Sequence, residues 1–135
     1  MIQRVSHMTV FCLDQDKAKD FYVNTLGFEV REDQTMGGFR WLTVAPKGQQ
    51  IEMILMPIVA GPMIDAENVA ALRRLIEKGM IGAGVLLTDD AQKTYEELSA
   101  KGVTFKGPPA ERPYGIELLM SDVSGLWYSV VQRPR

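Results

Sequence analysis

Two side chains on separate apolar segments have the chemistry for proton transfer or metal binding. His7 is the only histidine and lies in the segment 5–10, and Glu52 lies in the segment 51–55. Both segments are typical of β-strands, in which every second side chain shares a face. An imidazole and a carboxylate are the groups that general acid–base catalysis and divalent metal ions use. A single histidine excludes a two-histidine, one-carboxylate iron triad within one chain.

A third carboxylate and several aromatic residues are candidates for a pocket. Glu117 lies on the opposite strand face from Ile116 and Leu118. If Glu117 points into a pocket, it could form an acid–base set with His7 and Glu52. The alternative is that Glu117 is an exposed carboxylate on the strand, because unpaired glutamate is seldom buried. The aromatic residues at strand spacing favour either the wall of a pocket for a planar ligand or simple core packing. They are Phe39, Trp41, Tyr114 and Trp127.

The elements that must position these residues occur twice. Asp14 and Asp90 each precede a helical segment, and Gly27 and Gly102 each follow one at the same spacing. An aspartate can accept hydrogen bonds from the first helical turn, and a glycine supplies the left-handed exit from the helix. Each half therefore predicts a strand, a capped helix, a glycine stop and three further strands.

The alternation of apolar residues and the positions of turn residues give the element boundaries. The expected strands are 5–13, 28–33, 39–45, 50–56, 81–88, 103–106, 114–121 and 126–132, and the expected helices are 14–26, 65–78 and 90–100.

Composition excludes several classes of protein. A chain of 135 residues with 46% hydrophobic residues is long enough for a real core, and a net charge of −2 argues against binding to nucleic acid. No apolar run approaches the ~20 residues that span a bilayer, and the first residues lack the apolar stretch of a secretion signal. Cys12 is the only cysteine, which fits a reducing cytoplasm, and we expect a packed thiol rather than a nucleophile.

The ordered set of these motifs resembles the vicinal oxygen chelate superfamily, which includes glyoxalase I, the bleomycin and fosfomycin resistance proteins and the extradiol dioxygenases. The motifs are His7-Met8-Thr9-Val10, Asp14…Phe21-Tyr22…Leu26-Gly27-Phe28, Ile51-Glu52, Asp89-Asp90…Gly102-Val103 and Asp122-Val123-Ser124-Gly125. The resemblance implies an α+β fold of two βαβββ modules that form a mostly antiparallel, half-barrel sheet around a central pocket. The whole chain, 1–135, is then one domain, with module one at about 1–57, a linker and helix at about 58–80, and module two at about 81–135.

The same resemblance implies a metal site that takes one ligand from the first and last strand of each module. Those positions hold His7 and Glu52 in the first module, and Ala83 and Ser129 in the second. The side chain of alanine has no lone pair to donate, and a serine hydroxyl is a poor ligand for a borderline divalent metal ion. Because a catalytic metal usually needs three protein ligands, we expect no cofactor, with a weakly bound divalent metal at His7 and Glu52 as the alternative.

Two classes of function follow from the resemblance. The first is metal-independent binding of a small organic molecule in a pocket that includes Trp41, Ala83, Tyr114, Glu117, Trp127 and Ser129. The second is a glyoxalase-type lyase or isomerase in which Glu52 is the general base and His7 its partner. A cytoplasmic homodimer with a small-molecule ligand, and with neither nucleic acid nor membrane as partner, is expected in both cases.

Overall fold

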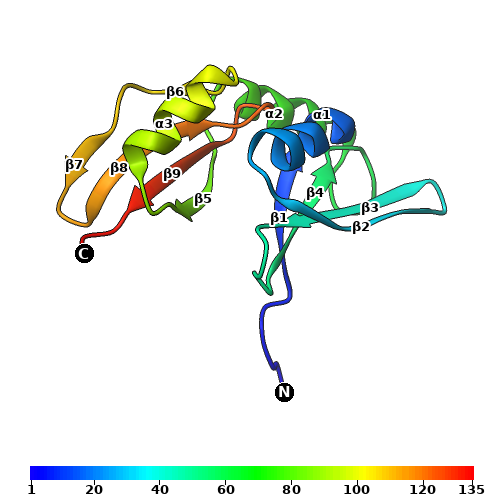
Figure 1. Ribbon diagram of the computed structural model, residues 1–135. Coiled ribbons are helices and arrows are strands. Elements are labelled where there is room, and N and C mark those ends of the chain that lie inside the picture. Colours follow the sequence, from blue (N-terminus) through cyan, green and yellow to red (C-terminus); the bar gives the residue numbers. More distant parts are fainter. The chain divides into compact units, whose positions relative to one another are not determined.

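The computed structural model describes all residues, 1–135, and divides into two compact units (Figure 1). The first unit is Met1–Arg73 and the second is Arg74–Arg135, so that the division falls within helix α2, Ala66–Glu77. Each unit contains one twisted sheet with a helix that follows its first strand. The two βαβββ modules and the α+β class that the sequence predicts are therefore present.

The first unit has a four-stranded sheet in the order β1-β4-β3-β2. Its elements are β1 (His7–Cys12), α1 (Gln15–Asp20), the π-helical turn η1 (Phe21–Thr25), β2 (Glu29–Met36), β3 (Phe39–Ala45) and β4 (Glu52–Pro57). β1 and β4 are parallel, and the other pairs are antiparallel. The β1–β4 register places His7 directly opposite Glu52, so the two residues share one face of the sheet.

The opposite face of this sheet forms the core of the first unit. Val10 and Cys12 on β1, and Met53 and Leu55 on β4, are buried together with Phe21 and Tyr22 of η1. Strand alternation sends these residues to one side and His7 and Glu52 to the other. The apolar side of the sheet is thus covered, and the polar side is left open for a site.

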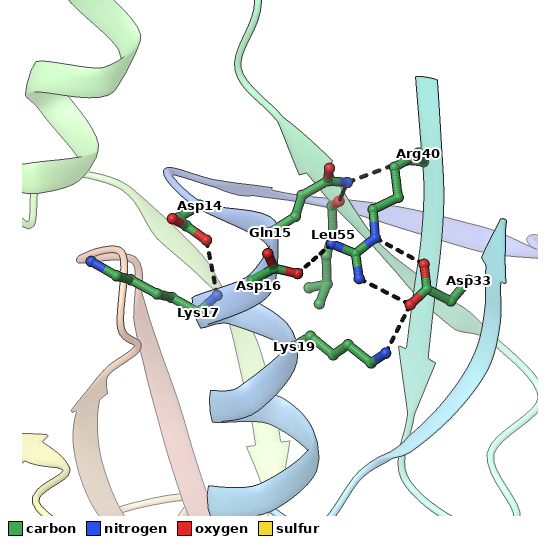
Figure 2. A network of polar contacts seen from close by, with 8 residues as sticks. All are labelled: Asp14, Gln15, Asp16, Lys17, Lys19, Asp33, Arg40 and Leu55. Atoms are coloured by element: carbon green, nitrogen blue, oxygen red, sulfur yellow. Dashed lines mark hydrogen bonds and ion pairs between the residues drawn. The ribbon is translucent and has the colours of Figure 1, made fainter. Parts of the chain in front are cut away.

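A polar network attaches helix α1 to the sheet (Figure 2). Arg40 of β3 donates two hydrogen bonds to Asp33 of β2, at 2.8 and 2.9 Å, and one to Asp16 of α1 at 2.6 Å. Lys19 of α1 donates to the same Asp33 carboxylate at 2.8 Å. The hydrogen bonds from Arg40 and Lys19 hold the pKa of Asp33 well below its ordinary value. The β2–β3 hairpin is therefore fixed against the helix by a shared ionised carboxylate.

The second unit repeats this plan with one additional short strand. Its elements after α2 are β5 (Gly82–Leu87), α3 (Ala91–Ala100), β6 (Thr104–Phe105), β7 (Ala110–Arg112), β8 (Gly115–Ser121) and β9 (Trp127–Gln132). The strand order is β5-β9-β8-β6, and β7 pairs with β8. β5 and β9 are parallel, whereas the other pairs are antiparallel. The buried side chains Leu118, Met120, Tyr128 and Val130 form the core of this unit.

The turn between β8 and β9 is built on Asp122. Its carboxylate oxygen Oδ1 accepts backbone N–H hydrogen bonds from Ser124, Gly125 and Leu126 at 2.9–3.0 Å. Gly125 has a φ of +116°, and a Cβ at this position would lie 2.2 Å from the carbonyl oxygen of Ile76. Only glycine fits there, so the turn lies directly against the end of α2.

Local capping signals in the sequence predicted the helix ends correctly. Asp14 and Asp90 accept hydrogen bonds from the backbone N–H groups of Lys17 and Lys93, at 3.0 and 2.9 Å. Gly27 and Gly102 have positive φ angles of 81° and 88° and end the helical segments.

Three details differ from the prediction. The helix expected at 14–26 becomes a π-helical turn after Asp20, and β7 forms between the strands expected at 103–106 and 114–121. The strand expected at 103–106 is reduced to Thr104–Phe105. No helix is both long enough and apolar enough to cross a membrane.

Candidate functional site

A closed set of polar contacts occupies the open face of the first sheet. The Nε2 atom of His7 lies 3.7 Å from Oε1 of Glu52, and both side chains are half-buried. The other ring nitrogen, Nδ1, lies 2.9 Å from the hydroxyl of Ser6. The structure thus brings together the imidazole and the carboxylate that the sequence singles out.

Thr43 links this pair to strand β2. Its hydroxyl donates to Oε1 of Glu52 at 2.6 Å and accepts the backbone N–H of Glu32 at 3.1 Å. The β2–β3 register shifts between Val30 and Glu32, and this β-bulge is where the Thr43 hydroxyl replaces a backbone acceptor. Thr43 is fully buried. The Thr43 hydroxyl therefore orients the Glu52 carboxylate and accepts the backbone N–H of Glu32 that the bulge leaves without a partner in the ladder.

Trp41 completes the set. Its indole N–H donates to the Glu32 carboxylate, and its ring meets the His7 ring edge-on, with centroids 5.4 Å apart. The imidazole is consequently held between a carboxylate and an aromatic ring.

The same residues do not fit a catalytic metal ion. His7 and Glu52 supply two donors, and no group of three or more His, Cys, Asp or Glu side chains is placed to hold a metal. The Glu52 oxygen nearest to His7 already accepts the Thr43 hydroxyl. A catalytic zinc site usually has three protein ligands, so this arrangement is one ligand short.

The second unit contains a cavity of about 720 Å³ on the open face of its sheet. Apolar walls come from β5 and β9, with Val85, Leu87, Trp127 and Val131 among the lining residues. Polar groups of Glu117 and Ser129 lie within the same wall. Such a concave, mostly apolar surface with few polar groups is typical of sites for small organic ligands.

Glu117 is the central charge of this cavity. Ser129 on β9 donates its hydroxyl to Oε2 of Glu117 on β8 at 2.5 Å, and the Nε atom of Arg112 lies 3.4 Å from Oε1. The Glu117 side chain is 12% exposed. The Ser129 hydrogen bond, aided by Tyr114 and Arg112, lowers the pKa of Glu117 despite the opposing effect of burial. The exposed-carboxylate interpretation of Glu117 is therefore wrong, and the group lines the cavity as an anion.

The β7–β8 turn brings two further polar side chains to this carboxylate. Arg112 ends β7, and Tyr114 lies in the two-residue connection before Gly115. A hydrogen bond with Glu117 raises the pKa of the Tyr114 phenol, so the phenol stays protonated near neutral pH. Glu117 thus also interacts with two exposed donors, Arg112 and Tyr114, which a ligand could replace.

Trp127 forms a wall because of a glycine on the neighbouring strand. A Cβ at Gly82 would lie 2.8 Å from Cζ2 and 2.9 Å from Cε2 of the Trp127 indole. Gly82 pairs with Trp127 in the β5–β9 ladder. The indole therefore rests on the bare backbone of Gly82, and its side chain is 42% exposed.

The pocket residues taken from the sequence divide between the two units. Five of them, Ala83, Tyr114, Glu117, Trp127 and Ser129, line the cavity of the second unit, whereas Trp41 contacts His7 in the first.

The ladder of the second unit is irregular at Ala83. The β5–β9 register shifts between Gly82 and Gly84, so Ser129 pairs with Val85, not with the Ala83 backbone. The repeat alone could not show this shift, because it reflects an extra residue in one strand.

Sequence reasoning missed four contributors. They are Glu32, Thr43, Gly82 and Arg112. Thr43 could have been predicted, because it lies on the same strand face as Trp41. Glu32 depends on a β-bulge, Gly82 on a contact with the Trp127 ring and Arg112 on a short hairpin, and sequence spacing reveals none of these.

Comparison with known proteins identifies the family. The model of the Glyoxalase/Bleomycin resistance protein/Dioxygenase superfamily matches residues 4–127. The chain belongs to this superfamily. Among curated relatives, YurT of Bacillus subtilis (strain 168) is 34% identical over 130 residues, which cover 93% of this chain and 95% of YurT.

Two solved structures are close to this chain in fold. UcmS2 is 48% identical with a TM-score of 0.90, and the match covers 98% of this chain and 99% of UcmS2. TnmS3, an antibiotic binding protein from Streptomyces sp. CB03234, is 32% identical with a TM-score of 0.77, and the match covers 98% of both chains. The solved structures that resemble this chain thus include that of an antibiotic-binding protein.

Proposed function

We propose that this superfamily member binds a small organic molecule of the antibiotic type in the cavity of its second unit, without a metal ion. The observation that carries the proposal is Glu117, a carboxylate with a lowered pKa that is held by Ser129 in the wall of a mostly apolar cavity. A half-buried carboxylate with an exchangeable donor fixes the orientation of a ligand, and the apolar walls supply the affinity.

The cavity has the size and the chemistry for such a ligand. Its volume of about 720 Å³ lies inside the range of roughly 300–1,000 Å³ that is usual for drug-sized molecules. Trp127 presents an aromatic surface beside the aliphatic Val85 and Leu87. A ligand with an aromatic body and one hydrogen-bond donor for Glu117 fits this combination.

The likeness to TnmS3 supports the same class of ligand. The donor set supports the absence of metal, because His7 and Glu52 provide only two ligands. We accordingly expect the purified protein to hold well under one equivalent of nickel, zinc, iron or manganese by elemental analysis.

A panel of antibiotics tested by thermal shift examines the proposal directly. A ligand at about 100 times its Kd adds about 2.7 kcal/mol to stability, which raises the Tm of a domain this size by about 9 °C. We expect Trp127→Ala to reduce that shift strongly. Phe39→Ala is the matched control, because Phe39 is 40% exposed but lies in the first unit.

Two results would refute the proposal: a panel without any stabilising compound, or a shift that Trp127→Ala leaves unchanged. A shift that appears only after a divalent ion is added would contradict the metal-independent part.

The second candidate function is proton transfer by a lyase or isomerase of glyoxalase type. The 3.7 Å approach of His7 to Glu52, with Thr43 orienting the carboxylate, favours it. Glu52 would remove a proton from carbon beside a carbonyl group, and His7 would stabilise the product. Deuterium uptake from D2O into an α-hydroxy ketone, followed by NMR, tests this role. Glu52→Gln should abolish the uptake and Glu29→Gln should not.

The proposal includes a cytoplasmic homodimer. The buried thiol of Cys12 is compatible with a reducing compartment. Val85 and Leu87 are exposed on the edge strand β5, and such apolar surface is usually covered by a ligand or a partner. Sedimentation equilibrium should give twice the chain mass of 15.1 kDa, and a monomer at micromolar concentration would contradict the dimer.

A further inference from the structure

A second cavity of about 640 Å³ lies on the same sheet of the second unit. It is lined by Leu119 and Ser121, which follow Glu117 on one side of β8, and by Trp127. The first cavity shares Glu117 and Trp127 with it. The two hollows therefore meet at one carboxylate and one indole.

The Trp127 indole is the partition between them. Its ring atoms rest over Gly82, where a Cβ would come within 2.9 Å of two of them. Because the ring lines both cavities, a ligand in either cavity can contact it. A molecule longer than one cavity would pass beside the ring and reach the second hollow.

The charge of the second cavity differs from that of the first. Lys78 and Lys106 both line it, both are exposed, and neither has a carboxylate partner within 4.0 Å. Glu117, the acidic group on the border, already interacts with Ser129 and Arg112. Two free ammonium groups beside an apolar floor fit an anionic group on an apolar body.

Two carbonyl groups at the nearby end of α2 are already hydrogen-bonded. The helix carbonyl groups of Leu75 and Ile76 accept backbone N–H hydrogen bonds from Met80 and Gly79, at 3.1 and 3.0 Å. These carbonyl dipoles are thus satisfied before a ligand arrives. Lys106 is held beside the cavity by its own backbone N–H, which donates to the Leu119 carbonyl at 2.9 Å.

We propose that the cavity beside Lys78 and Lys106 is a second lobe of the binding site and takes an acidic group of the ligand. The inference rests on the proposed function and names its ligand class: an aromatic molecule with a carboxylate or a similar anion at one end. The aromatic body lies against Trp127, and the anion faces the two lysines.

Three naphthalene probes of one shape separate the contribution of charge from that of the aromatic ring. They are 2-naphthoate, 2-naphthamide and 2-naphthylmethylammonium, each titrated by calorimetry at pH 7.5 in low salt. We expect the wild-type chain to bind the carboxylate about tenfold more tightly than the amide, since two partly exposed ion pairs contribute about that much. The ammonium probe should bind most weakly.

A double variant tests which residues cause the preference. In the variant with both Lys78→Gln and Lys106→Gln, 2-naphthoate and 2-naphthamide should bind with equal affinity. In the wild type, 0.5 M NaCl should reduce the difference in affinity between these two probes. Both lysines are exposed, so the variant should fold. Lys47→Gln is the control, because Lys47 is an exposed lysine of the first unit between β3 and β4.

Equal binding of carboxylate and amide, or a preference that survives the double variant, would overturn the second lobe and leave small-molecule binding intact. Tightest binding of the ammonium probe would assign charge selection to Glu117 and also overturn it. If no naphthalene probe binds, the aromatic-acid assignment fails, while the thermal-shift panel still decides the proposed function separately.

Discussion

Ser129→Ala removes one hydroxyl and thereby tests the electrostatics of the cavity. Ser129 is buried, and its hydroxyl donates to Glu117 at 2.5 Å across the β8–β9 pair. A hydrogen bond to a charged group contributes roughly 1.5–3 kcal/mol. Because Arg112 and Tyr114 also interact with the carboxylate, we expect the loss to lie near the lower value, about 1.5 kcal/mol at pH 7.

The effect must depend on pH in one direction. The pKa of Glu117 is lowered in the folded protein, so its contribution to stability is present above the unfolded pKa and is lost as the pH falls through the folded value. Ser129→Ala should raise the folded pKa of Glu117 back toward its ordinary range. The stability difference between variant and wild type should therefore be largest above about pH 5 and shrink below about pH 4.

Urea unfolding between pH 3 and 8, with carbon NMR of the Glu117 carboxyl, measures both quantities. Ser121→Ala is the control, because the Ser121 hydroxyl donates to the neighbouring Asp122 carbonyl and not to Glu117. A stability loss that is the same at every pH, or an unmoved pKa of Glu117, would refute the reasoning even if the variant is less stable.

Three further changes test separate parts of the structure. Asp33→Asn should lower the free energy of unfolding by about 1–2 kcal/mol at pH 7, and this difference from the wild type should disappear as the pH falls toward the lowered pKa of Asp33. If urea unfolding shows the same difference at every pH from 7 down to 3 and below, the network in Figure 2 is not the cause. Gly82→Ala should displace the Trp127 indole at a cost of about 1–3 kcal/mol and shift its fluorescence emission to the red; unchanged emission in a background that lacks the other tryptophan would disprove the ring contact. Thr43→Val keeps the shape but leaves the backbone N–H of Glu32 without an acceptor, so thermal unfolding should show a loss of about 1–3 kcal/mol, and a neutral result would mean that the bulge does not need the hydroxyl.

Local sequence signals were enough to predict the framework of both units. Asp14 and Asp90 fix the helix starts because a side-chain carboxylate satisfies free N–H groups within the next three residues. The positive φ of Gly27 and Gly102 follows from a preference that needs no distant partner. The resemblance to the superfamily, and not strand parity, placed His7 and Glu52 in one site, and the β1–β4 register puts the two residues opposite each other.

The details of the site depend on contacts that lie far apart in sequence. Strand parity alone allowed Glu117 to be either a pocket residue or an exposed strand carboxylate. Its hydrogen bond to Ser129 on the next strand decides for the pocket. The role of Thr43 arises from a bulge in a different strand, and the Trp127 ring takes its place because the facing residue is Gly82. The periodicity of apolar residues cannot predict a shift of strand register or the position of an aromatic ring.

The indole N–H signals of the two tryptophans test the central claim most directly. Trp127 lines the cavity of the second unit, and Trp41 contacts His7 in the first, so each signal reports on one candidate site. In a 15N NMR titration of chelator-treated protein with 2-naphthamide, we predict a saturable shift of the Trp127 signal and a stationary Trp41 signal. Movement of Trp41 alone, or any response that requires an added divalent ion, would contradict metal-independent binding in the second-unit cavity.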